Sequence, residues 1–440
     1  MKTILRLSAY LVVSFFLSFV ETRAQVYYFP PLTGNAWDTI SPASLGWCQP
    51  QLDSLTDYLQ SRDTKAFLVL KDGKIVVEEY FGSFTKDSLW YWASAGKSLT
   101  AFLVGMAQQE GYLSIDDTTS RIIGPGWTSC TTAQEERITV RDQISMTTGL
   151  DDNVPDKDCT DPACLQYLDD AGARWAYHNA PYTLLDTVLE TATGQTLNMY
   201  LQQKVKAPTG MTGVFLKLGY NNVFFSTARS MARYGSLILN NGNWNGNQLM
   251  TDTAYFNQMV NTSQNLNLSY GYLWWLNGKS SYMLPGSQFV FPGSMTPNAP
   301  ADMFAALGRN GQILNIVPSQ NLIWLRLGNE PNSGFVPNFF NDTIWQKLNA
   351  AMCQTTELNE PKWELPFSVF PNPASVGENV VIQSGFTGHG VLTDMTGRVI
   401  RKFDLYTGEN KITLGGLQPG AFLLQVESDG IKTCRRLVVR

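Results

Sequence analysis

Two pairs of apolar segments, each joined by a tight turn, constrain the fold of this chain most strongly. The first pair, within residues 66–82, turns at Asp72-Gly73, a favoured hairpin sequence. The second pair, within residues 312–328, turns at residues 318–321. Helical periodicity predicts helices over residues 49–62, 98–109, 182–193 and 340–352. Strands at both ends with helices between them predict an α+β domain. In this domain helices flank one antiparallel sheet, and a helical region is inserted between the strands.

The chain changes character after residue 357. Residues 358–366 are polar and carry two prolines, which is typical of a linker. Residues 367–440 then contain short β-rich runs separated by glycine-bearing turns, a pattern that predicts a small β-sandwich. We therefore expect a main domain over residues 25–357 and a second domain over residues 367–440.

The first 24 residues have the layout of a secretory signal peptide. Lys2 and Arg6 begin it, residues 7–20 are apolar, and small residues at positions 22 and 24 offer a cleavage site. The apolar stretch is shorter than the ~20 residues that span a bilayer. The sequence thus predicts an exported protein without stable membrane insertion.

Export permits disulfide bonds. Cys159 and Cys164 could close a small ring, and Cys48 and Cys353 could staple the two ends of the main domain. Pairing cannot be derived from sequence, and free buried thiols remain the alternative.

Charge and histidine content exclude several kinds of protein. There are 32 Lys and Arg against 37 Asp and Glu, a net charge of -5. The chain thus has no excess of positive charge to neutralise phosphates, and we do not expect it to bind nucleic acid. The two histidines, His178 and His389, make a histidine zinc site or a Ser-His-Asp triad hard to build. We predict neither a metal nor a cofactor.

The segment that begins at Ser94 carries the strongest catalytic signal. If a helix begins near Ser94, Lys97 shares its face at i+3. A serine hydroxyl needs an adjacent base, and a lysine can serve when burial lowers its pKa. A second Ser-x-x-Lys, Ser83 to Lys86, lies in a polar turn and is interpreted as a solvated loop. The alternative for Ser94 and Lys97 is a helix N-cap with an exposed lysine.

Two further segments contain candidate site residues. Tyr177 precedes Asn179 by two positions, and a tyrosine near a lysine ammonium can act as a proton shuttle. The alternative for Tyr177 is an aromatic side chain packed on the helical region.

Arg309-Asn310-Gly311-Gln312 lies at the start of a predicted strand. Arg309 could hold a substrate carboxylate, and the N–H of Gln312 could complete an oxyanion hole with that of Ser94. The alternative is a glycine-rich turn entering a hairpin.

With these motifs in order, residues 30–353 resemble serine hydrolases related to class C β-lactamases, D-Ala-D-Ala carboxypeptidases, short-chain esterases and 6-aminohexanoate-dimer hydrolases. The spacing of 83 residues from Ser94 to Tyr177 is similar to that family. The resemblance implies a β-lactamase/transpeptidase-like fold, with Ser94 as acylated nucleophile, Lys97 as its base and Tyr177 as proton shuttle. It implies that Asn179 holds the substrate amide or Lys97. The family's usual Lys-Thr-Gly or His-x-Gly is replaced by residues 309–311, which favours the esterase and amide-hydrolase branch.

The C-terminal domain has its own resemblance. Residues 370–373, 394–399 and 417–420, with the terminal basic strand, resemble the type A sorting domain of the type IX secretion system of Bacteroidetes. This implies handling by that machinery, transit through the periplasm, and release or attachment at the cell surface. A carbohydrate-binding or adhesive sandwich is the alternative.

The sequence therefore predicts a secreted serine hydrolase that cleaves a small ester, amide or peptide. The alternatives are a non-hydrolytic peptidoglycan- or peptide-binding protein that retains the fold, and a surface adhesin. Residues 151–170 contain seven aspartates; they could form one wall of the cleft, although a solvated surface loop is the ordinary interpretation. Aromatic residues suggest an apolar acyl or leaving group, or belong to the core: Trp90, Trp92, Trp175, Trp274 and Trp275.

Overall fold

A computed structural model of the chain divides into two compact units, residues 1–354 and 355–440. The structure describes residues 27–330, 334, 336–353, 365, 367–394, 398–428 and 431–440. The predicted signal peptide, residues 1–24, and the predicted linker, residues 358–366 apart from Leu365, lie outside the described residues.

A six-stranded antiparallel sheet forms the centre of the first unit, in the order β2-β1-β13-β12-β11-β8. Its strands are β1 (Thr64–Lys71), β2 (Lys74–Tyr80), β8 (Trp275–Leu276), β11 (Phe304–Gly308), β12 (Gln312–Val317) and β13 (Leu322–Gly328). β1 pairs with β13, so the two predicted hairpins join along their inner strands. The predicted antiparallel sheet is confirmed.

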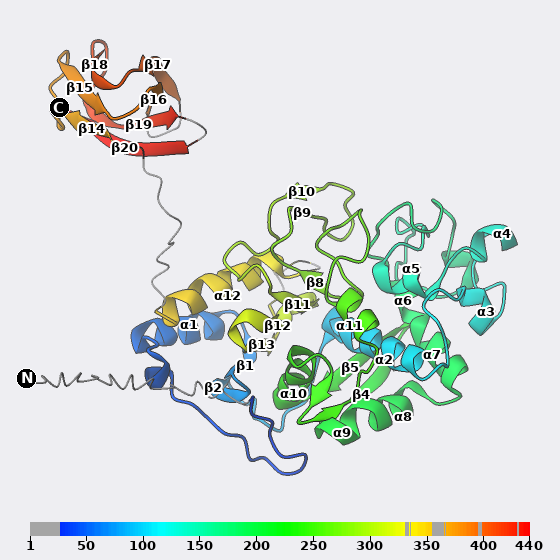
Figure 1. Ribbon diagram of the computed structural model, residues 1–440. Coiled ribbons are helices and arrows are strands. Elements are labelled where there is room, and N and C mark those ends of the chain that lie inside the picture. The colour runs from blue at the N-terminus through cyan, green and yellow to red at the C-terminus, as the bar shows by residue number, and fades with distance from the viewer. Residues whose placement is uncertain are drawn as a thin grey trace, which may run out of the picture. The chain divides into compact units, whose positions relative to one another are not determined.

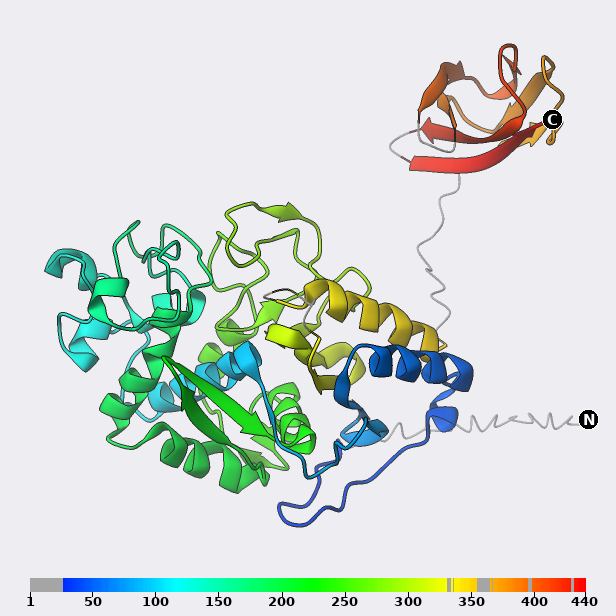
Figure 2. The ribbon, with the colours of Figure 1, turned by 180° about the vertical axis from the view of Figure 1, so that it is seen from behind.

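Helices cover both faces of this sheet (Figures 1 and 2). α1 (Gln49–Ser61) and α12 (Asn338–Ala351) pack against each other on one face. α10 (Ala228–Leu239) packs on β12, β13 and β1 from the other face. Gly235 permits this close packing, because a Cβ there would lie 3.0 Å from Ile323 and 3.1 Å from Leu314.

The inserted helical region surrounds α2 (Lys97–Gln109), in which every residue from Lys97 to Ala107 is buried. Its other helices are α3 (Thr119–Ile123), α4 (Thr132–Glu135), α5 (Val140–Ser145), α6 (Asn179–Thr183), α7 (Leu185–Thr193), α8 (Leu197–Leu201), α9 (Ala207–Thr209) and α11 (Thr253–Met259). The helix predicted over residues 182–193 is thus two helices, α6 and α7, which adjoin at Leu184.

Small sheets complete the first unit. β3 (Trp90–Tyr91), β5 (Asn221–Ser226) and β4 (Val214–Leu218) form a three-stranded sheet in that order. Two short hairpins are β6 (Asn243–Trp244) with β7 (Asn247–Gln248), and β9 (Ser281–Tyr282) with β10 (Phe291–Pro292).

Two disulfides match the pairs that the sequence suggested. Cys48, the N-cap of α1, bonds to Cys353, which follows α12. Cys159 bonds to Cys164 within the aspartate-rich loop. Within the part of the chain that the structure describes, no helix is long and apolar enough to cross a membrane.

The second unit consists of two antiparallel sheets, β14-β15-β18 and β17-β16-β19-β20. Its strands are β14 (Phe367–Phe370), β15 (Asn379–Ser384), β16 (Gly388–Asp394), β17 (Val399–Leu405), β18 (Gly408–Thr413), β19 (Gly420–Ser428) and β20 (Ile431–Val439). Val380 and Ile382 of one sheet share a buried cluster with Leu392 and Val426 of the other. The predicted small β-sandwich is confirmed.

Candidate active site

Ser94 lies in a short 3₁₀ turn, Ala93–Gly96, that leads from β3 into α2. Ala93 has φ +46°, in the left-handed region that residues with a side chain rarely adopt. The turn sets Ser94 three residues before Lys97, the first residue of α2. The Nζ atom of Lys97 lies 3.3 Å from Ser94 Oγ, so the two polar groups meet as the spacing predicts.

A buried tryptophan holds this turn in place. Trp92 is fully buried, and its indole N–H donates a 2.8 Å hydrogen bond to Ser226 Oγ on β5. Its ring meets Phe224 edge to face at 4.9 Å, and its backbone N–H donates to the Phe224 carbonyl oxygen. These contacts oppose movement of the Ser94 backbone.

Lys97 is enclosed by aromatic rings. Its Nζ atom lies 4.0 Å from the ring centre of Tyr182 and 5.4 Å from that of Tyr177. Only 5% of the residue is exposed, and this burial lowers the pKa of Lys97 from 10.5 to about 7, against the opposing influence of Asp158 and Asp186. The alternative of an exposed lysine at a helix N-cap is wrong, because the amine is buried and able to exist in the neutral form.

Tyr177 approaches Ser94 from the loop before α6. Its ring stacks on Trp275 at 5.6 Å and meets Tyr270 edge to face at 6.2 Å. Burial raises the pKa of the Tyr177 phenol, and a hydrogen bond with Ser94 works in the opposite direction. The phenol therefore stays protonated near neutral pH and can donate a proton. Ser94, Lys97 and Tyr177 thus come together at one point.

A cavity of about 200 Å³ opens beside Ser94 and Tyr177. It is lined by Ser94, Lys157, Asp158, Tyr177, Asn179, Pro285, Gly286 and Arg309. Asn179 and Arg309 were predicted from the sequence to bind substrate, and both form part of this wall. The amide nitrogen of Asn179 donates a 2.8 Å hydrogen bond to Asp158 Oδ1.

The rest of the predicted strand motif lies outside the cavity lining. Asn310 donates a 2.9 Å hydrogen bond to the Tyr91 hydroxyl. Gln312 is fully buried, and its side-chain amide exchanges hydrogen bonds of 2.6 and 3.0 Å with the backbone of Gly328. Gly311 is buried with φ +78° in the turn between β11 and β12. The side chains of Asn310 and Gln312 therefore hold the turn that carries Arg309.

Gly308, at the end of β11, lies against the backbone of the Ser94 turn. A Cβ on this residue would lie 2.4 Å from the Trp92 carbonyl oxygen and 3.1 Å from the Ser94 nitrogen. β8 pairs with β11 at Phe304 and Ala305, before this point is reached. The end of β11 therefore meets the Ser94 turn directly, as glycine alone allows.

Sequence reasoning missed several residues that shape the site. Tyr182 covers the Lys97 amine, and Trp275 supports the Tyr177 ring. Trp92, Trp175, Trp274 and Trp275 are core side chains rather than an exposed binding surface. Asp158 belongs to the aspartate-rich loop, for which a cleft wall was one of the sequence-based interpretations, and its carboxylate reaches the cavity.

His178 is buried between two site residues without joining the site. Burial lowers the pKa of its imidazole to about 4, so it is neutral near pH 7. Among the described residues, no group of three or more His, Cys, Asp or Glu side chains is arranged to hold a metal ion.

Comparison with known proteins agrees with this geometry. A family model described as Beta-lactamase matches residues 53–339, and one described as Secretion system C-terminal sorting domain matches residues 368–440. An uncharacterized protein of Alkalihalophilus pseudofirmus is 26% identical over 310 residues, which cover 62% of this chain and 85% of that protein.

Solved structures share the fold. A protein from Bacteroides dorei described as a candidate beta-lactamase has a TM-score of 0.56 at 18% identity, covering 70% of this chain and 100% of that one. A candidate 6-aminohexanoate-dimer hydrolase from Bacillus anthracis has 0.54 at 17%, covering 73% and 89%. A penicillin-binding protein homolog from Caulobacter crescentus has 0.53 at 14%, covering 70% and 99%. At these identities the likeness concerns the fold alone.

Proposed function

The chain belongs to the beta-lactamase family, and we propose that it cleaves an ester or amide through an acyl-enzyme on Ser94. It is a serine hydrolase-type enzyme. Its sorting domain directs it through type IX secretion to the cell surface or the medium. Lys97 is the base, and Tyr177 moves the proton of the leaving group. The observation that carries the proposal is the 3.3 Å contact between Ser94 Oγ and a buried Lys97 amine.

Acylation begins with neutral Lys97. Because the pKa of Lys97 is about 7, roughly half of the enzyme holds an uncharged amine at pH 7. That amine accepts the Ser94 proton while Oγ bonds to the substrate carbonyl carbon. The backbone N–H of Ser94, together with that of Gln312 at the start of β12, stabilises the oxyanion.

The leaving group departs with a proton from Tyr177. The Tyr177 phenol is protonated, so it can protonate the departing oxygen or nitrogen as the carbon–heteroatom bond breaks. The ammonium of Lys97 then returns a proton to the Tyr177 oxygen. A water molecule reverses the same relay to release the acid and regenerate Ser94.

The substrate is a small ester, amide or short peptide. A cavity of about 200 Å³ fits such a group around its carbonyl carbon. Residues 309–311 read Arg-Asn-Gly rather than Lys-Thr-Gly, and we therefore propose esters and linear amides ahead of β-lactams.

The test compares two serine variants of the full secreted protein on p-nitrophenyl acetate and butyrate. Ser94→Ala should abolish turnover and labelling by a fluorophosphonate probe. Ser83→Ala is the matched control, because Ser83 begins the second Ser-x-x-Lys in an exposed turn, and it should leave both unchanged. Turnover that survives in Ser94→Ala would refute the proposal.

Substrate class requires a parallel profile. Nitrocefin, D-Ala-D-Ala peptides and linear amide oligomers should be compared with the esters under the same conditions. If nitrocefin were turned over faster than every ester and linear amide, the proposed preference for esters and linear amides over β-lactams would be refuted. Labelling of Ser94 without turnover of any substrate would instead identify a non-hydrolytic binding protein.

A further inference from the structure

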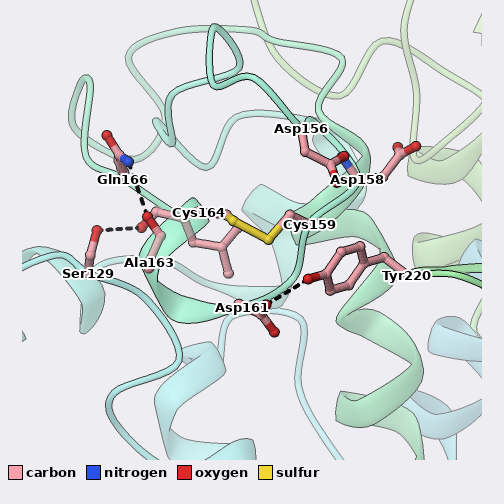
Figure 3. The surroundings of a disulfide bond; sticks show 10 residues. Ser129, Asp156, Asp158, Cys159, Asp161, Ala163, Cys164, Gln166 and Tyr220 are labelled. Atoms are coloured by element: carbon pink, nitrogen blue, oxygen red, sulfur yellow. Dashed lines mark hydrogen bonds between the residues drawn. A yellow bond between two sulfur atoms is a disulfide. The ribbon is translucent and has the colours of Figure 1, made fainter.

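Lys157 and Asp158 line one side of the catalytic cavity and directly precede a loop that a disulfide closes. Figure 3 shows the Cys159–Cys164 bond with Asp158 directly before it. Inside this loop, Asp161 Oδ2 accepts a 2.6 Å hydrogen bond from the Tyr220 hydroxyl. Cys159 is buried, with 4% of its surface exposed. The bond and the Tyr220 contact together oppose movement of this loop.

Asp158 joins the loop to the helix that follows Tyr177. Its backbone N–H donates to Asp156 Oδ1 at 3.0 Å, and its own Oδ1 accepts the Asn179 amide at 2.8 Å. The Ala180 N–H donates to the carbonyl oxygen of Lys157 at 3.1 Å, which repeats the connection one residue earlier. The Asp158 carboxylate is half-buried on the cavity wall beside Ser94 and Tyr177.

The Asp158 carboxylate is one of two acidic groups that act on Lys97. The other is Asp186 on α7, whose pKa is raised by burial to about 7 and which hydrogen-bonds to Asn222. The rings of Tyr177 and Tyr182 and the hydroxyl of Ser94 also face the Lys97 amine.

Two cations, Lys157 and Arg309, line the same cavity as Asp158. Among the residues that line this cavity, Asp158 is the acidic one, and its carboxylate also acts on the Lys97 amine.

We propose that Asp158 is a positioning residue of this active site. The Cys159–Cys164 loop holds its carboxylate where it orients the Asn179 amide and attracts the charged form of the Lys97 amine. The inference rests on the proposed Ser94 chemistry. The aspartate-rich loop is then a working part of the enzyme rather than solvated surface.

The test separates the charge of Asp158 from its hydrogen bond. Asp158→Asn keeps an acceptor for Asn179 and removes the negative charge, so the acidic limb of kcat/KM should move to lower pH by about 0.5–1 unit. Asp158→Ala removes both, and should add an increase in KM of about tenfold for one lost hydrogen bond. Asp158→Glu should return the limb toward that of the wild type. The control is Asp169→Asn, because Asp169 is an exposed residue of the aspartate-rich segment 151–170 outside the disulfide-closed loop, and the change should alter neither quantity.

The loop bond is tested by the double variant Cys159→Ala, Cys164→Ala, which should raise KM as Asp158→Ala does. For any variant that turns over slowly, the rate of fluorophosphonate labelling of Ser94 can be measured as a function of pH instead. Its acidic limb reports the same ionisation of Lys97 as the acidic limb of kcat/KM. An Asp158→Asn enzyme whose limb coincides with that of the wild type would overturn the inference and leave the Ser94 proposal standing. Loss of the Ser94 proposal itself would appear instead as activity in Ser94→Ala.

Discussion

Replacing Lys97 by methionine should stabilise the first unit while abolishing hydrolysis. The folded protein buries the amine and lowers its pKa from 10.5 to about 7. The unfolded chain leaves the same amine in water, where it holds its proton more tightly, so folding must give up part of the free energy of protonation. Methionine has a similar length and no amine, so it fills the pocket beside Tyr182 without this cost.

The magnitude follows from the size of the pKa shift. A shift from 10.5 to about 7 is worth about 5 kcal/mol at ~1.4 kcal/mol per unit. At pH 7 half of the folded molecules are already neutral, and the cost there is about 4 kcal/mol. Because the folded pKa lies below the unfolded one, the unfolded state binds more protons between about pH 7 and pH 10.5. Wild-type stability therefore rises with pH across that window, and the advantage of Lys97→Met shrinks toward zero at its upper end.

Urea unfolding at pH 6, 7, 8.5 and 10, followed by tryptophan fluorescence, measures this difference. All the tryptophans except Trp363 precede residue 354, so the signal reports chiefly on the first unit. Lys86→Met is the control, because the side chain of Lys86 is 41% exposed and belongs to the second Ser-x-x-Lys. A Lys97→Met protein less stable than the wild type at pH 7, or a gap that stays constant up to pH 10, would show that the reasoning is wrong.

Four further outcomes are expected. The value of kcat/KM for a p-nitrophenyl ester should rise about tenfold per pH unit below pH 7 and level off above it, because Lys97 loses its proton with a pKa of about 7. A flat profile from pH 5 to 9 would contradict this expectation. Tyr177→Phe should lower kcat by about 10²–10⁴-fold and affect fluorophosphonate labelling far less, since fluoride leaves without a proton; equal losses in both would refute the assigned role. Gly308→Ala should slow labelling of Ser94 by about 100-fold, because its Cβ would lie 2.4 Å from the Trp92 carbonyl oxygen; unchanged labelling would refute the close approach. Cys48→Ser with Cys353→Ser should lower the free energy of unfolding by about 2–5 kcal/mol and leave kcat unchanged, which urea unfolding and ester turnover would check.

The parts of the fold that depend on local pattern could be predicted from the sequence. The hairpin of β1 and β2 follows from two apolar runs and Asp72-Gly73, and both hairpins appear where expected. The contact between Ser94 and Lys97 follows from a spacing of three residues, even though Ser94 lies in a 3₁₀ turn before α2. Neighbours in sequence that share a helical face meet in almost any fold.

The parts of the fold and of the site that depend on long-range packing could not be predicted from the sequence. Gln312 begins β12, and a shift of one residue in a strand decides which face a side chain occupies. Its amide faces Gly328 in the interior, a placement that follows from the pairing of β12 with β13. Tyr182 and Trp275 enclose the site from segments far from Ser94, and no feature of their own sequence distinguishes them from other core aromatics.

The bond between Cys48 and Cys353 has a mechanical consequence for a chain that is pulled from both ends. Force entering at residue 353 passes through the sulfur atoms to residue 48, because the two positions are covalently joined across 305 residues of sequence. The hydrolase core between them is shielded from that load. When both ends are pulled, the catalytic side chains therefore stay in place, and reduction of this one bond would let the load reach the core.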